Sequence, residues 1–169
     1  GHLLSEHGRF GKNNRDSRIF IENDKRYEEP WPLYRDITHL NMMMHVPGVK
    51  AGRTDALMQP VDLFPTICDV CSIEKPETLE GKSVLPVLKG ETTAHRETVI
   101  TTAWPIGNSS MITDDRWVLH ILKGGETELL FDLEKDPDEE NDIRADNGNE
   151  AERLKKSIAA ELSLTELPV

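Results

Sequence analysis

The spacing of apolar residues changes along the chain, and each spacing predicts a different element. Residues 37–46, Ile-Thr-His-Leu-Asn-Met-Met-Met-His-Val, are almost continuously apolar and precede Pro47 and Gly48, a pattern that predicts a strand buried on both faces. Residues 60–71 carry apolar side chains at positions 63, 64, 67, 70 and 71, which predicts a helix with one wide buried face. A buried strand followed by such a helix is typical of an α/β sheet.

After residue 91 the pattern changes to short segments of strand character separated by turn residues. Asp114, Asp115, Gly124 and Gly125 are the turn-forming residues between these segments. We therefore expect a small antiparallel sheet in this part of the chain. Its expected strands are residues 97–102, 110–113, 117–122 and 128–133.

The last stretch with a clear period is residues 149–162, where Leu154, Ile158 and Leu162 recur at intervals of four. This spacing predicts an amphipathic closing helix whose Arg153, Lys155 and Lys156 face outward and whose role is packing.

The elements together predict an α/β fold in two parts. Residues 1–90 are expected to belong to the α/β core, a mixed sheet with helices, and residues 91–169 to a C-terminal subdomain with the antiparallel sheet and the closing helix. Residues 13–36 are rich in charge and contain Pro30 and Pro32, which predicts a long surface loop.

The composition excludes some classes of partner. The chain has 169 residues, of which 37% are hydrophobic, enough for a modest core, and its net charge is -11. Nucleic acids and anionic membranes both reward a basic surface, so neither is expected as a partner. No apolar run approaches the ~20 residues of a membrane span. An acidic protein can still hold an anion locally, and the compartment stays open.

Three short motifs have ordinary structural explanations. Cys68 and Cys71 have no second ligand pair for zinc, so buried structural thiols are expected. The Gly-Lys-Ser at residues 81–83 is not a Walker A loop, because the position that requires the first glycine is Pro76, and we expect a turn and a short helix instead. The acidic residues 136–142 lack the glycine and glutamate of an EF-hand, which favours a solvated turn.

Candidate site chemistry is concentrated in residues 1–12, Gly-His-Leu-Leu-Ser-Glu-His-Gly-Arg-Phe-Gly-Lys. The glycines of this run allow a loop that presents Lys12 toward a bound anion, with His7 nearby. A flexible, solvated start to the chain is the alternative. His39 and His45 lie at the ends of the apolar run, where a structural role is the commoner one for a histidine.

Five blocks of sequence occur in a particular order along the chain. They are residues 1–12, 38–48, 60–66, 81–90 and 128–137. Together they resemble the C-terminal part of the sulfatase family, within the alkaline-phosphatase-like superfamily. The most specific block is Pro-Val-Asp-Leu-Phe-Pro-Thr at residues 60–66, which resembles the family block Val-Asp-Leu-Phe-Pro-Thr. Ser5 replaces a usual glycine and Asn41 a usual proline.

The resemblance implies hydrolysis of a sulfate ester by a formylglycine, with a calcium ion holding the sulfate and the nucleophile. By resemblance Lys12 matches the lysine that contacts the sulfate. Lys12 and His7 are then the expected catalytic residues, and Lys12 and His39 the expected substrate contacts. The implied substrate is a sulfated small molecule or a sulfated carbohydrate.

The chain lacks the rest of the family's machinery. It has no Cys/Ser-x-Pro-x-Arg motif and no N-terminal aspartate pair, and the last calcium ligands are expected just before Gly1. No metal ligand and no cofactor are therefore assigned to this chain alone, which is expected to be inactive. Apolar surface around Met42 to Met44 is expected to be exposed, and to associate with the missing N-terminal portion or with a second copy.

Two other functions stay open from the sequence. One is hydrolysis of a phosphodiester or a phosphonate ester within the same superfamily, whose members share most of these blocks. The other is a non-catalytic binding module that kept the fold.

Overall fold

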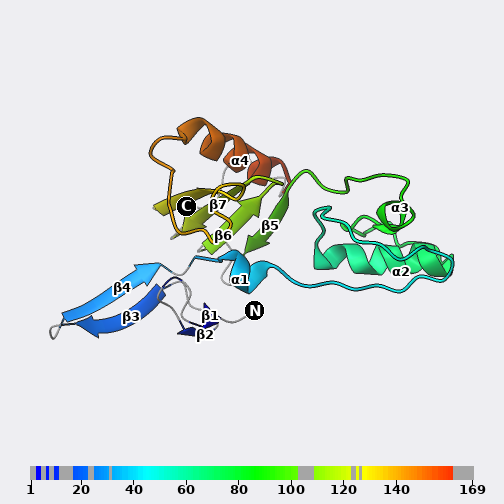
Figure 1. Ribbon diagram of the computed structural model, residues 1–169, viewed down its shortest axis with the longest axis horizontal. Helices are drawn as coiled ribbons and strands as arrows, with labels where there is room; N and C mark the ends of the chain where they lie inside the picture. The colour runs from blue at the N-terminus through cyan, green and yellow to red at the C-terminus, as the bar shows by residue number, and fades with distance from the viewer. Residues whose placement is uncertain are drawn as a thin grey trace. The chain divides into compact units, whose positions relative to one another are not determined.

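The computed structural model describes residues 3–4, 7, 10–11, 17–22, 25–30, 32–102, 109–122, 125 and 127–161. Contacts divide the chain into two compact units, residues 1–41 with 100–169 and residues 42–99. The boundary expected at residue 90 concerns the domains of a complete protein and stays a prediction. Figure 1 shows the elements, which are β1 (Leu3–Leu4), β2 (Phe10–Gly11), β3 (Ser17–Glu22), β4 (Lys25–Pro30), α1 (Arg35–Thr38), α2 (Leu63–Cys71), α3 (Leu85–Leu88), β5 (Val99–Thr102), β6 (Ser109–Thr113), β7 (Trp117–Leu122), β8 (Thr127–Asp132) and α4 (Gly148–Glu161).

The first unit contains a four-stranded sheet in the order β5-β6-β7-β8. β7 is antiparallel to both neighbours, with Met111 opposite His120 and Val118 opposite Phe131. The turn between β6 and β7 is closed by Asp114, whose Oδ1 accepts from the backbone N–H of Trp117 at 2.6 Å. The four predicted strands are confirmed to within two residues at each end.

Helix α4 covers one face of this sheet (Figure 1). Ala151, Leu154 and Ile158 pack on a cluster that includes Leu119 and Leu130, all of them buried. The predicted closing helix is therefore confirmed, although Leu162 lies outside the described residues.

One side chain of α4 differs from the prediction. Lys155 is half-buried and not outward, because its Nζ lies 2.8 Å from Glu128 Oε1 on β8. Arg144 also pairs with Glu128, with 2.7 Å between Nε and Oε2. The two cations fasten the helix and the segment before it to the edge strand.

The opposite face of the sheet is covered by the segment around α1. Tyr34 packs there with Met111, Val118 and Phe131. His120 lies on the same face, and its ring stands edge-on to Phe131 with 5.7 Å between centroids. β7 is consequently buried on both faces. Its sequence suits this position, because five of its six residues are apolar and the sixth is His120.

Two sequence predictions in this part of the chain are wrong. The strand expected over residues 37–46 is absent, since α1 ends at Thr38 and no regular element follows up to residue 46. A strand needs a neighbour for its backbone hydrogen bonds, and no described strand pairs with this stretch. Residues 13–36, expected as a loop, contain the antiparallel hairpin of β3 and β4. The expected apolar exposure holds for Met42 and Met43, which are 41% and 99% exposed, whereas Met44 is half-buried.

The second unit is built on α2, which follows a 3-10 turn at Pro60–Asp62, and on α3. Both predicted helices are confirmed. Gly81 lies before α3 and is required there, because a Cβ at this position would be 2.0 Å from the Val61 carbonyl oxygen. The glycine of the Gly-Lys-Ser block therefore allows the backbone at residue 81 to pack closely against the backbone at Val61.

The Asp62 carboxylate joins three segments of this unit. It is buried, and it accepts hydrogen bonds from the backbone N–H groups of Gln59 and Lys82, each at 2.9 Å. Its oxygens also face the Arg96 side chain at 2.9 and 2.5 Å and His95 Nε2 at 3.1 Å. Burial alone would raise the pKa of the Asp62 carboxyl, but the hydrogen bonds from Arg96, Lys82 and Gln59 outweigh it and hold the pKa well below its usual range.

The buried side of α2 differs from the prediction. Pro65, Thr66 and Cys68 are buried, whereas the exposed fractions of Leu63, Phe64 and Ile67 are 37%, 52% and 51%. The wide apolar face thus lies on the surface of the described unit.

The two cysteines of α2 also differ in their exposure to solvent. Both are free, and Cys68 is buried as predicted, but Cys71 is exposed, so its prediction as a buried thiol is wrong. No helix in the described part of the chain has the length and apolar character that crossing a bilayer demands.

Replacing Asp62 by asparagine is expected to destabilise the second unit by about 3–5 kcal/mol, because it removes the negative charge opposite the buried Arg96 guanidinium. Urea unfolding followed through the NMR signals of the α2 amides measures this loss. Asp55→Asn is the matched control: Asp55 is 96% exposed in its contact with Arg53, and its loss should change stability by less than about 0.5 kcal/mol. Equal effects of the two substitutions would contradict this assignment.

The same unit should lose stability in acid. The folded pKa of Asp62 is lowered, so its contribution is fully present above the unfolded pKa of about 3.9 and is lost as the pH falls below it. We expect the urea midpoint of α2 in the natural chain to begin to fall near pH 4 and to continue falling as the pH is lowered further. In Asp62→Asn that fall should be smaller, and an identical fall in both would refute the role of this carboxyl.

Candidate functional site

The candidate site of the first unit is organised around His7. Its ring stacks on the Tyr34 ring with 3.6 Å between centroids and an interplanar angle of 1°. On its edge, Nε2 lies 3.4 Å from Asp36 Oδ2, and the His7 side chain is only 8% exposed. A stack that fixes the plane of the ring and a carboxylate that fixes its edge hold the imidazole in one orientation.

The backbone of His7 adds to this picture. Its φ of 53° lies in the left-handed region, which a residue with a Cβ adopts rarely and at some energetic cost. Two contacts offset this energetic cost. They are made with Tyr34 and Asp36, which lie 27 and 29 residues further along the chain.

A polar hollow of about 290 Å³ adjoins this histidine through Asp36. Its lining residues bring a guanidinium, a carboxylate, an imidazole and an amide to one place, a set of donors and acceptors suited to a polar or anionic ligand. They are Arg35, Asp36, His39, Asn41 and Pro137.

Two of the predicted site residues share Asp36 as a neighbour. Asp36 contacts His7 and lines the hollow with His39, although His7 and His39 are 32 residues apart in the sequence. Lys12, the leading prediction, lies outside the described residues. Asp36, Arg35 and Asn41 were missed by sequence analysis. A signal was available for them, because they flank His39 in and just before the family block that begins at residue 38.

A buried polar pair lies behind Tyr34 and was also missed. His120 Nε2 is 3.2 Å from Glu139 Oε2, and the two side chains are 0% and 1% exposed. The same oxygen accepts from the backbone N–H of Arg35 at 3.3 Å. Residues 136–142 were expected as a solvated turn, and this is wrong for Glu139, since its carboxylate is needed beneath α1.

No described group of three or more His, Cys, Asp or Glu side chains could hold a metal ion.

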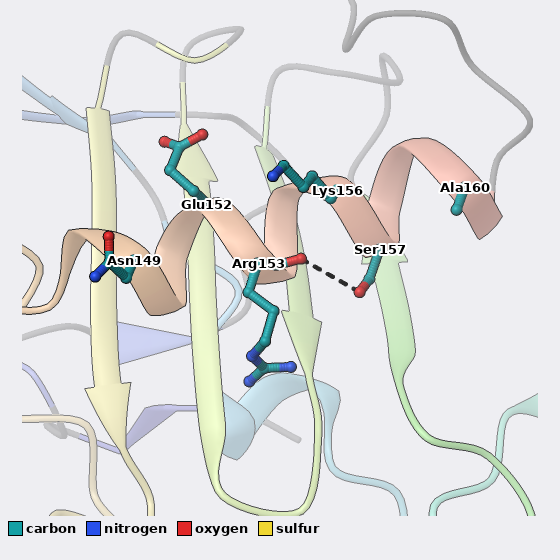
Figure 2. Close-up of a pocket in the computed structure, with 6 residues that line it drawn as sticks. All are labelled: Asn149, Glu152, Arg153, Lys156, Ser157 and Ala160. Atoms are coloured by element: carbon teal, nitrogen blue, oxygen red, sulfur yellow. Dashed lines mark hydrogen bonds between the residues drawn. The ribbon is translucent and has the colours of Figure 1, made fainter.

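A larger hollow, of about 490 Å³, lies along the outer side of α4 (Figure 2). Arg153 is paired there with Glu150 at 2.8 Å and with Asp114 at 2.6 Å, and Ser157 donates to the Arg153 carbonyl at 3.3 Å. These contacts are those of a solvated helix face. Neither His7 nor His39, the two predicted site residues that the structure describes, lines this hollow.

Comparisons with known proteins agree on one family. The family described as "N-sulphoglucosamine sulphohydrolase, C-terminal" matches residues 23–166. The Delta 4,5-hexuronate-2-O-sulfatase of Bacteroides thetaiotaomicron is 30% identical over 68% of this chain and 26% of its own length. Human arylsulfatase K is 32% identical over 63% of this chain and 22% of its own length. The chain therefore spans about a quarter of the length of these relatives.

The fold agrees with this match. A solved structure described under the metabolism of multiple glycosaminoglycans by Bacteroides thetaiotaomicron superposes with a TM-score of 0.57. It is 20% identical, and the likeness covers 70% of this chain and 30% of that one. The likeness shows a shared fold, in agreement with the α/β class that the sequence predicts.

The stack predicts an NMR signature. In Tyr34→Leu the His7 ring protons should lose the ring-current shift and move downfield, because the aromatic plane at 3.6 Å is gone. Tyr34→Phe keeps the ring and should leave these signals nearly unchanged. The exposed His39 and His45 serve as internal references. Unchanged His7 signals in Tyr34→Leu would show that the rings do not stack in solution.

Proposed function

This chain belongs to the sulfatase family, and we propose that it is the C-terminal portion of a sulfatase that hydrolyses a sulfate ester on a sulfated carbohydrate. The observation that carries the proposal is the family match over residues 23–166. The carbohydrate is suggested by the relative that is named as a hexuronate-2-O-sulfatase. The polar hollow beside His7 supports it, because its mixed donors and acceptors suit the hydroxyl and anionic groups of a sugar.

In this proposal each site residue has one role. Lys12 provides a point charge for the sulfate oxygens, on which negative charge develops during transfer. His7 is held in one orientation by Tyr34 and Asp36, and His39 contacts the sugar from the hollow. In the complete enzyme, the formylglycine nucleophile and the calcium ligands would come from residues other than those described here.

The exposed apolar face of α2 is proposed as the contact with the rest of the sulfatase polypeptide. Leu63, Phe64 and Ile67 are exposed together with Val61 and Ile73, whose exposed fractions are 52% and 58%. A row of large apolar side chains of this kind marks an interaction surface. The relatives have about three quarters of their length beyond the matched part, which is ample chain to cover it. In isolation, a second copy is the expected occupant.

The isolated chain is expected to bind sulfate without hydrolysing its esters. Sulfate should shift the amide signals of residues 7–12 in an NMR titration, and Lys12→Ala should weaken binding about tenfold or more, whereas Lys12→Arg retains the charge and most of the affinity. Release of the phenol from an aryl sulfate by the pure chain would refute the assignment of the nucleophile elsewhere. An unchanged sulfate affinity in Lys12→Ala would refute the role of Lys12.

The α2 face predicts self-association of the isolated chain. Light scattering should give a mass above that of the monomer, and Phe64→Glu should return it to the monomer by placing a charge within the apolar row. Thr93→Glu, at an exposed position of the same unit outside this row, is the control and should leave association unchanged. A monomer at all concentrations would contradict an adhesive α2 face.

A further inference from the structure

The buried residues His120 and Glu139 are unusual within the first unit. Histidine and glutamate rarely lie in a core unless they are paired, and here both are almost completely buried between the sheet and α1. Among the described residues, neither His120 Nδ1 nor Glu139 Oε1 has a hydrogen-bond partner. A buried polar atom without a partner is costly, so apolar side chains of similar volume would serve stability better.

The backbone of Glu139 points the same way. Its φ of 55° is left-handed, a conformation that favours glycine or asparagine in a turn. The preceding turn does not depend on this side chain, since Asp136 already accepts from the backbone N–H groups of Glu140 and Asn141 at 3.1 and 2.8 Å. A strained backbone persists only where surrounding contacts determine it, which directs attention to the groups that the Glu139 carboxylate contacts.

Those contacts lead to His7. Glu139 Oε2 receives the backbone N–H of Arg35, the first residue of α1, and the same oxygen faces His120. The His120 ring lies 5.5 Å from the Tyr34 ring, and Tyr34 in turn stacks on His7. The pair therefore supports from below both the ring that His7 stacks on and the short helix that carries Asp36.

We propose that the buried His120–Glu139 pair is a positioning device for the candidate site, holding Tyr34 and the start of α1 so that His7 keeps one orientation. The pair does not touch the ligand. Its relevance to catalysis rests on the proposed sulfatase function, but its effect on His7 does not. If the pair were purely structural, its removal would destabilise the sheet without changing the orientation of the His7 ring.

The experiment uses the 169-residue chain with three variants. Glu139→Gly suits the left-handed backbone and removes the carboxylate, Glu139→Gln keeps an oxygen acceptor, and Glu140→Gly is the matched control at the exposed neighbouring position. The readouts are hydrogen exchange at the Arg35 amide, the His7 ring-proton shifts, sulfate affinity, and exchange protection in β6 to β8 as a measure of the fold.

In Glu139→Gly we expect the Arg35 amide to exchange about tenfold to a hundredfold faster and the His7 ring protons to move toward the positions of an unstacked histidine, with protection of the sheet retained. Glu139→Gln should restore both signals, and Glu140→Gly should change neither. Sulfate binding should weaken in Glu139→Gly by about threefold or more.

An unchanged His7 in Glu139→Gly with a faster Arg35 amide would overturn the proposal, as would changes that merely follow loss of sheet protection. If Glu139→Gly does not fold, His120→Phe keeps a ring between Tyr34 and Phe131 and removes only the contact with Glu139. It must then shift the His7 ring protons in the same direction, whereas the Arg35 amide keeps its acceptor on Glu139. A response at His7 in a chain that binds no sulfate would support the positioning role and reject the sulfate site proposed at Lys12.

Discussion

The second unit depends on a single buried carboxylate. Asp62 receives two backbone N–H groups, a guanidinium and an imidazole from segments up to 34 residues away. Without these donors a charged oxygen pair could not be buried at acceptable cost. Thr66, one turn further along, repeats the arrangement by donating to the Asp62 carbonyl at 2.6 Å and accepting from the Val84 N–H at 2.9 Å. Polar contacts of Asp62 and Thr66 thus join α2 and the turn before it to the segment that leads into α3.

This arrangement explains why the most specific sequence block predicted its helix correctly and its buried face wrongly. Helical spacing is a local property, so α2 could be predicted from residues 60–71 alone. The side that is buried depends on what packs against it. In the described unit the polar Asp62 and Thr66 face inward, whereas Leu63, Phe64 and Ile67 face solvent. The sequence thus predicted that these apolar side chains line one side of the helix, although not that this side is exposed. It also predicted the exposed apolar stretch around Met43.

The first unit shows the same division between local and long-range information. The strands and α4 followed from alternation and from four-residue spacing, because each pattern lies within one segment. The site did not, since its contacts join His7 to Asp36 and Arg35 to Glu139 across 29 and 104 residues. Sequence resemblance singled out His7 and His39, and the fold showed that Asp36 connects them. Glu139 was hidden in an acidic run whose composition is that of a turn.

The two units share a design in which sequence-distant polar groups determine geometry and apolar groups supply cohesion. In the first unit, the sheet and α4 are held by a continuous apolar cluster, which needs no further support from His120. The costly histidine and glutamate lie on the other face, under Tyr34. Strain at His7 and at Glu139 lies at the two ends of this chain of contacts. Since strain persists only where surrounding contacts determine it, the two residues are best understood as parts of one arrangement that orients the imidazole.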